Sequence, residues 1–155
     1  MIRSILAGLM LAVLCACAAP TPDVTRAAQE PVLKLYPNET PELRQSINYW
    51  ADHYEVPRTL VQRVVIREST HRPEARNGPY YGLMQILPAT ARGMGYEGPN
   101  RGLLDADTNL EFAVKYLRGA WLLADGDEKR AVKLYAKGYY PEAKRQGMLE
   151  ETGLR

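Results

Sequence analysis

Hydrophobic residues recur at helical spacing through most of the chain that follows residue 40. Apolar residues three or four positions apart mark amphipathic helices, and this spacing runs through residues 43–54, 60–65, 110–121 and 131–135. Residues typical of helix starts precede these segments, namely Thr40-Pro41, Pro57, Asp105 and Asp127. Pro88 and Pro141 are expected to open two shorter helices. Since only residues 80–87 suit an extended segment, the pattern predicts a mainly α, single-domain fold.

The first residues have a different pattern, typical of an export signal. Arg3 precedes an uncharged apolar run over residues 5–19, which is short for a membrane span of about 20 residues. We therefore expect a signal peptide over residues 1–16. Leu14-Cys15-Ala16-Cys17 resembles a bacterial lipobox, in which Cys17 becomes the lipidated first residue. Ordinary cleavage after Ala18 is the alternative.

Prolines without apolar periodicity follow the signal, so residues 17–40 are expected to form a flexible tether. The folded domain is expected over residues 41–147, with a tail over 148–155. Cys15 and Cys17 are the only cysteines, so no disulfide is expected within the exported domain. The formal net charge of +2 gives no indication of a nucleic-acid partner.

Several motif-like features are better explained by ordinary structure. Residues 93–98 match G-x-G-x-x-G, but no strand precedes them and Pro99 follows where a helix should start. His53 and His71 are the only histidines and have no companion ligands, so we expect both at the surface and no metal site. No cofactor is expected. Ser69 and His71 are two positions apart, which places them on different sides of a helix and argues against a hydrolase dyad.

Glu68 is the candidate for chemistry. It continues the apolar stripe of the second helix, four residues after Val64 and three after Val65. Partial burial raises the pKa of a carboxyl group and keeps it protonated to act as an acid. The alternative is an outward-facing glutamate that pairs with a neighbouring arginine, for which the candidates are Arg63, Arg67 and Arg72.

The surrounding motifs resemble the soluble lytic transglycosylase family of the lysozyme-like superfamily. The resemblance rests on ordered matches from about Pro41 to Gly138, which are Glu68-Ser69, Pro73, Ala75, Gly82-Leu83-Met84-Gln85-Ile86, Pro88, Thr90-Ala91, Asp105, Asn109, Tyr116-Leu117, Tyr135 and Gly138. It implies a lysozyme-like helical fold with a cleft that binds the glycan strands of peptidoglycan. It also implies that Glu68 is the catalytic acid and base.

The same resemblance implies roles for five more residues. Ser69 would orient Glu68, Met84 and Gln85 would line the cleft beside the sugar, and Tyr135 would stand near the carboxylate. Gly82 would allow close approach of backbone to a ligand or a packed helix, and Met84 could instead be a core residue. The family usually has asparagine at position 136, where this chain has alanine. Tyr139-Tyr140 could supply substitute contacts or could be packing residues.

The distribution of carboxylates bears on the reaction. Hydrolysis of a glycosidic bond ordinarily uses two carboxylates, but none lies between Glu74 and Glu97. As in the family, Glu68 would therefore act with the substrate's own acetamido group, and the product would be a 1,6-anhydro sugar. A lysozyme-type hydrolase, with Asp105 or Asp107 as second acid, and a wall-binding module without turnover are the alternatives.

The expected setting follows from the signal and the resemblance together. The protein would be exported to the periplasm as an outer-membrane lipoprotein held by Cys17, with peptidoglycan glycan strands as its partner. The sequence leaves open whether it serves wall turnover or a secretion or conjugation machine.

Overall fold

The computed structural model describes residues 34–154, which form one compact unit. The expected signal peptide, Cys17 and most of the expected tether lie outside the described residues. Within residues 34–154, no helix has both the length and the hydrophobicity needed to cross a membrane.

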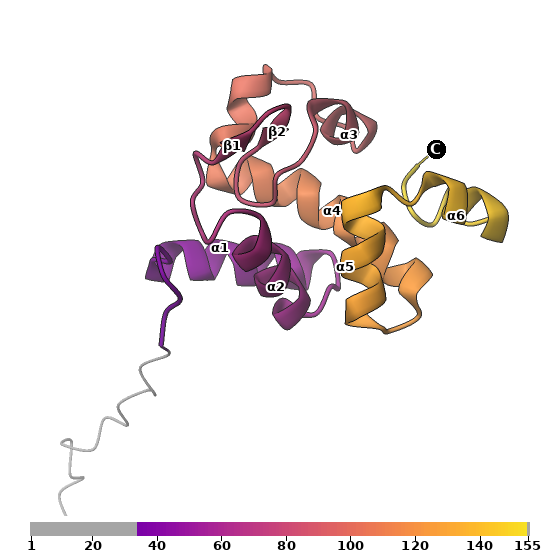
Figure 1. The fold of residues 1–155 in the computed structure, drawn as a ribbon, viewed down its shortest axis with the longest axis horizontal. Coiled ribbons are helices and arrows are strands. Elements are labelled where there is room, and N and C mark those ends of the chain that lie inside the picture. Colours follow the sequence, from indigo (N-terminus) through magenta and orange to yellow (C-terminus); the bar gives the residue numbers. More distant parts are fainter. Residues whose placement is uncertain (1–33, 155) are drawn as a thin grey trace, which may run out of the picture. The chain divides into compact units, whose positions relative to one another are not determined.

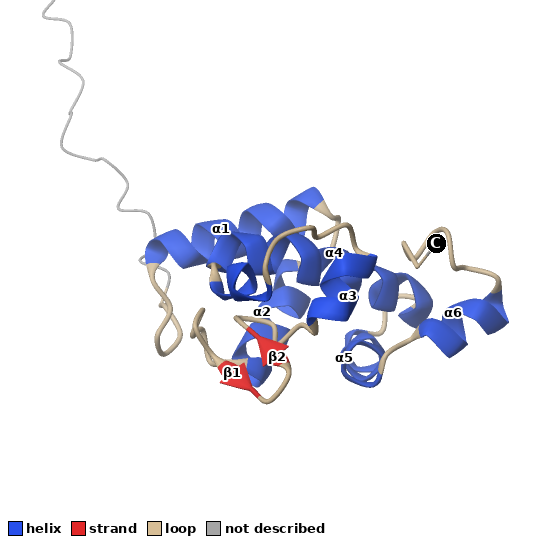
Figure 2. Ribbon diagram, turned by 90° about the horizontal axis from the view of Figure 1, so that it is seen from above, coloured by secondary structure: helices blue, strands red, loops and turns tan. Residues whose placement is uncertain are grey.

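Helices dominate the described chain, and the only sheet in it is a very short hairpin (Figure 2). The elements are α1 (Pro41–His53), α2 (Arg58–Glu68), β1 (Arg76–Asn77), β2 (Tyr80–Tyr81), α3 (Pro88–Gly93), the 3-10 helix η1 (Asn100–Leu104), α4 (Ala106–Ala124), α5 (Glu128–Lys137) and α6 (Tyr140–Gln146). The predicted mainly α fold class is therefore confirmed.

Side-chain caps begin three of the helices, α1, α4 and α5, at the positions that the sequence predicts. The Thr40 hydroxyl accepts the Leu43 amide at 3.1 Å, and the Asp105 carboxylate accepts the Thr108 amide at 2.8 Å. Asp127 accepts two amides at the start of α5. Each bond satisfies a backbone donor that the helix cannot satisfy itself. Gly138 follows the last turn of α5 with a positive φ of 79°.

Helix α4 is the centre of the fold, because α1, α3, α5 and η1 all pack against it. Figure 1 shows α1 and α2 on one side of α4 and the hairpin with α3 on the other. The stripe predicted for α2 is fully buried, comprising Leu60, Val61, Val64 and Val65. At the end of α1 the stripe is less buried than predicted, since Trp50 and Tyr54 are only partly covered. Trp50 instead donates its indole N–H to Asp107 at 3.0 Å.

The extended segment expected over residues 80–87 is a hairpin followed by a tight turn. Arg76–Asn77 pairs with Tyr80–Tyr81, and Tyr81 forms one further bridge to Ile86. Gly82 has φ of +73° and Gln85 has φ of +50°, so the chain reverses between them. This reversal explains why residues 80–87 do not run as one strand.

Packing continues beyond both ends of the expected domain. Glu39 belongs to the expected tether, yet it is only 7% exposed. Leu149 and Thr152 belong to the expected tail, yet they are 7% and 2% exposed. A side-chain contact also holds the tail, since the Arg118 guanidinium of α4 donates to the Glu151 backbone carbonyl at 3.3 Å. In the structure, the described segments on both sides of 41–147 are part of the folded unit.

Candidate active site

Glu68 is the last residue of α2, and its side chain faces a pocket. The pocket has a volume of about 330 Å³ and is lined by Arg67, Glu68, Asn77, Tyr80, Gln85, Tyr135 and Ala136. Helix α2 positions Glu68 at this pocket because the preceding residues of the same apolar stripe are buried in the core. The Glu68 side chain is 22% exposed, so the carboxyl group is mostly covered but open to a ligand from the pocket.

The surroundings of Glu68 favour its protonated form. Burial raises the pKa of Glu68, and the charge of Arg67 opposes this rise. Arg67 Nε lies 3.4 Å from Glu68 Oε1, but the arginine side chain is 51% exposed and water screens its charge. The other two candidate partners are occupied elsewhere: Arg63 pairs with Glu128, and Arg72 donates to the Ser69 carbonyl. The net effect leaves a carboxylic acid with a raised pKa in a cleft, the condition expected of a proton donor.

A second pocket extends the space beside Glu68. It has a volume of about 160 Å³ and shares Tyr80, Gln85, Tyr135 and Ala136 with the first. Because the two pockets share four residues, they form one cleft between the hairpin and α5. Among the described residues that line this cleft, Glu68 has the only carboxylate. Asp105 caps α4 and Asp107 accepts the Trp50 indole, so neither of the alternative second acids lines it.

Gln85 contributes an acceptor to the cleft. Its side-chain nitrogen donates to the Ala75 carbonyl at 3.0 Å and to the Gly82 carbonyl at 2.8 Å. Both amide protons are therefore used within the loop, and the amide oxygen is left to accept. A ligand group that meets Gln85 here would have to be a donor, such as a hydroxyl or an acetamido N–H.

Gly82 and Met84, two of the predicted site residues, do not line either pocket and have structural roles in the loop beside the cleft. A Cβ atom on Gly82 would lie 2.3 Å from the Asn109 side-chain nitrogen and 2.3 Å from the Leu103 carbonyl oxygen, so only glycine fits against α4. Asn109 is fully buried and donates to the Tyr81 and Leu103 carbonyls. It also accepts the Met84 amide at 2.9 Å. The Met84 side chain is fully buried, which agrees with the core alternative rather than with contact to a sugar.

Tyr135 connects α5 to the loop that contains Met84. Its hydroxyl donates to the Met84 carbonyl at 2.8 Å, and the ring is 8% exposed. Burial, together with the nearby charge of Glu68, raises the pKa of Tyr135 well above its usual value. The phenol therefore keeps its proton and holds the cleft wall in position.

Ser69 and His71 follow Glu68 but do not bond to its carboxyl group. The Ser69 hydroxyl donates to the Val65 carbonyl at 3.3 Å and accepts the Arg72 amide at 3.3 Å, so it closes the end of the helix. His71 was expected at the surface, and this prediction is wrong: the residue is fully buried and hydrogen-bonds Gln62. His53 is exposed, as predicted.

The departure at position 136 leaves a small residue in the cleft. Ala136 lines both pockets. Tyr139 is fully buried and donates to the Tyr116 carbonyl at 2.8 Å, which makes it a packing residue. Tyr140 is 52% exposed and is not part of either pocket lining. Neither tyrosine takes the place of an asparagine side chain in the cleft.

Sequence reasoning gave no role at the site to several residues that line the cleft, among them Asn77, Tyr80, Leu87 and Lys137. Tyr80 lies in both pockets and is 41% exposed, so its ring is available to a ligand. The turn signal Asn77-Gly78-Pro79 could have indicated a hairpin, but a strand of two residues has no periodicity that would reveal which side faces the cleft.

Within residues 34–154, no three His, Cys, Asp or Glu side chains are grouped so that they could hold a metal ion.

Comparison with known proteins identifies the family of this chain. No solved structure matches the chain. The family described as "Transglycosylase SLT domain" matches residues 45–150, which include every residue of the cleft. The chain therefore belongs to the transglycosylase SLT domain family, whose activity is directed at peptidoglycan.

Proposed function

We propose that this protein is a lytic transglycosylase that cleaves the β-1,4 bond between N-acetylmuramic acid and N-acetylglucosamine. Membership in the family supports transglycosylase activity on peptidoglycan. One observation carries the finer proposal: a single, mostly covered carboxyl group with a raised pKa lines a cleft that has no second carboxylate among its described residues.

In the proposed reaction, protonated Glu68 donates its proton to the glycosidic oxygen as the bond between that oxygen and C1 breaks. The acetamido oxygen of the muramic acid attacks C1 and stabilises the positive charge. The Glu68 carboxylate then accepts the proton of the C6 hydroxyl group as the C6 oxygen attacks C1. The bond to the acetamido oxygen breaks, a 1,6-anhydro sugar is released, and Glu68 is protonated again.

The cleft supports this intramolecular route over hydrolysis. A hydrolase of the common type needs a second carboxylate to activate water or to act as nucleophile, and Glu68 is the only one in the described lining. The C6 hydroxyl group is part of the reacting sugar, so its effective concentration is high, roughly 10⁵ M or more when it is well aligned. Gln85 presents an acceptor toward the same space and could orient a sugar N–H or hydroxyl.

Digestion of purified peptidoglycan in ¹⁸O-labelled water tests the proposal. We expect muropeptides whose muramic ends carry no label and are one water lighter than hydrolysis products. Stoichiometric label at new reducing ends would identify a muramidase-type hydrolase on the same fold. Binding without any new ends would identify a non-catalytic peptidoglycan-binding module.

We further propose that the protein is exported and held at the outer membrane by a lipid on Cys17. The sequence around Cys17 supports this, and residues 1–33 lie outside the described structure. Intact-mass analysis of the mature protein is the test. A protein that starts at Cys17 with a lipid mass agrees with the proposal, whereas one that starts at Ala19 without lipid contradicts it.

A further inference from the structure

We propose that Tyr36, Asn38 and Glu39, which precede the first helix, are positioning residues that hold the end of α2 and thereby the Glu68 side chain. We call residues 36–39 the N-terminal clasp. This inference rests on the proposed role of Glu68 as the acid. It assigns a function to residues that lie before the family match, which begins at residue 45.

The backbone just after Glu68 is in a conformation that needs support. Thr70 has φ of +52° and His71 has φ of +58°. Two consecutive residues with side chains in the left-handed region are strained, and such strain persists only where surrounding contacts enforce it. Whatever holds residues 70 and 71 in place also fixes where α2 ends, two residues earlier.

The N-terminal clasp makes contact with both strained residues. The Asn38 side-chain nitrogen donates to the Thr70 carbonyl at 2.9 Å. The Tyr36 ring stacks on the His71 ring, with centroids 5.5 Å apart and an angle of 9° between the planes. These contacts join residues that are more than thirty positions apart in the sequence.

Glu39 extends the support to the middle of α2. The Glu39 side chain is fully buried. Its carboxylate accepts a hydrogen bond from Gln62 Nε2 at 2.9 Å, and Gln62 Oε1 accepts a hydrogen bond from His71 Nε2 at 2.8 Å. Arg44 of α1 pairs with the same carboxylate and also lies over the Tyr36 ring. Because the Gln62 amide oxygen can only accept, His71 Nε2 carries the proton of this bond.

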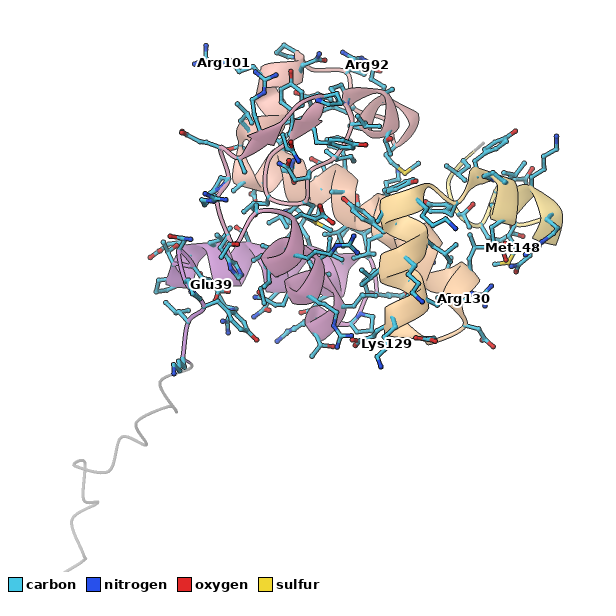
Figure 3. The ribbon with its side chains drawn as sticks, in the orientation of Figure 1. Glu39, Arg92, Arg101, Lys129, Arg130 and Met148 are labelled. Atoms are coloured by element: carbon cyan, nitrogen blue, oxygen red, sulfur yellow. The ribbon has the colours of Figure 1, made fainter. Side chains whose placement is uncertain are left out.

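Together these bonds connect the clasp, α1 and α2 to the turn that follows Glu68. Figure 3 shows Glu39 immediately before the first turn of α1. Without the clasp, residues 69–71 would lose partners that oppose relaxation of their backbone, and the last turn of α2 would loosen. Glu68 would then be more hydrated and less well placed for proton transfer.

Paired substitutions at Tyr36 test this inference, because Tyr36 is 45% exposed and its replacement should leave the core intact. Tyr36→Ala removes the stacked ring, whereas Tyr36→Phe keeps it. Asn38→Gly removes the bond to Thr70 while allowing the positive φ of 63° at position 38. Tyr49→Ala is the matched control, since Tyr49 is an aromatic residue of α1 that is 59% exposed and lies outside the clasp.

We expect Tyr36→Ala and Asn38→Gly to lower kcat on peptidoglycan on the order of tenfold, with KM nearly unchanged. The pKa of Glu68, measured by NMR on a ¹³C-labelled carboxyl group, should fall toward the usual glutamate value because the group becomes more hydrated. Tyr36→Phe and Tyr49→Ala should match the parent protein in both measurements. The charged and titratable groups that act on Glu68 from the packed elements are Arg67 of α2 and Tyr135 of α5, and none of these variants alters them.

An unchanged Glu68 pKa in both Tyr36→Ala and Asn38→Gly would overturn the inference, as would a loss of kcat equal in Tyr36→Phe and Tyr36→Ala. The pKa measurement needs no turnover. If the parent protein binds peptidoglycan but forms no product, the proposed function fails while the positioning of Glu68 by the clasp is still decided.

Discussion

Glu39 and Glu68 are both mostly removed from water, yet their pKa values move in opposite directions. Burial by itself raises the pKa of each carboxyl group. Glu39 also accepts hydrogen bonds from Arg44, the Tyr36 amide and Gln62, and these lower its pKa to about 2. For Glu68, the charge of the exposed Arg67 is the only influence that lowers the pKa, and burial outweighs it. The comparison shows that the donors around a buried carboxyl group, rather than burial alone, decide whether it stabilises the fold as an ion or remains available as an acid.

Glu68→Gln should have the largest effect on activity. The amide keeps the shape of the side chain but has no transferable proton, so the rate should fall by about 10² to 10⁴. Release of soluble muropeptides measures the effect, and circular dichroism checks that the fold is intact. A folded variant with near-normal turnover would remove Glu68 from the mechanism.

Glu39→Gln should have the largest effect on stability. The substitution leaves Arg44, whose side chain is 13% exposed, without its carboxylate partner. Breaking a buried ion pair from one side costs about 3–5 kcal/mol of unfolding free energy. Urea unfolding measures the loss, and Glu150→Gln, at an exposed position, should change stability by less than about 0.5 kcal/mol. Equal stability of the two variants would contradict the structural role of Glu39.

Acidification should destabilise the protein through two groups of the same network. Glu39 has a folded-state pKa of about 2, below its ordinary value of 4.5, so its contribution is complete above pH 4.5 and is lost as the pH falls toward 2. Burial, the largest influence, lowers the pKa of His71 below 6.5, so this contribution too is complete above pH 6.5 and declines as the pH falls. The loss from Glu39 should be on the order of 3 kcal/mol.

Unfolding free energies measured between pH 7 and pH 2 test this expectation. The curve should flatten in Glu39→Gln below pH 4.5, because that variant has no carboxyl group to protonate at this position. A Glu39→Gln curve with the same slope as the parent protein in this range would show that other groups cause the acid loss.

Arg67→Gln should have the smallest effect and should sharpen the contrast between the two carboxyl groups. Removing the positive charge 3.4 Å from Glu68 lets burial raise the Glu68 pKa further. Since the reaction starts from protonated Glu68, the alkaline limb of the pH–rate profile should move to higher pH. Arg63→Gln, one turn earlier on α2 and paired with Glu128, is the control and should leave the limb in place. If the alkaline limb of the pH–rate profile, measured at low salt, lies at the same pH in Arg67→Gln as in the parent protein, then Arg67 does not act on Glu68.

The fold was predictable from the sequence wherever local chemistry decides structure. Caps at Thr40, Asp105 and Asp127 begin helices whatever lies beyond them, and the periodicity of α2 places Glu68 at the end of a buried stripe. The burial of Glu39 and His71 was not predictable, because it depends on partners far away in the sequence: Gln62 is 23 residues from Glu39. For the same reason, the lining of the cleft could be predicted only in part from the sequence. Tyr80 and Leu87 come together with α5 only through tertiary packing.

Asn109 has a consequence for the order in which the site can be assembled. Its side chain joins Tyr81, Met84 and Leu103, so the loop beside Glu68 takes its shape only when α4 has docked. The bond to Tyr81 spans 28 residues and the bond to Met84 spans 25, which makes this a non-local contact that is costly to form early in folding. During synthesis, the chain contains its acid at residue 68 well before the residue that shapes the surroundings of that acid. An incomplete chain therefore carries the reactive group without the cleft that would give it a substrate.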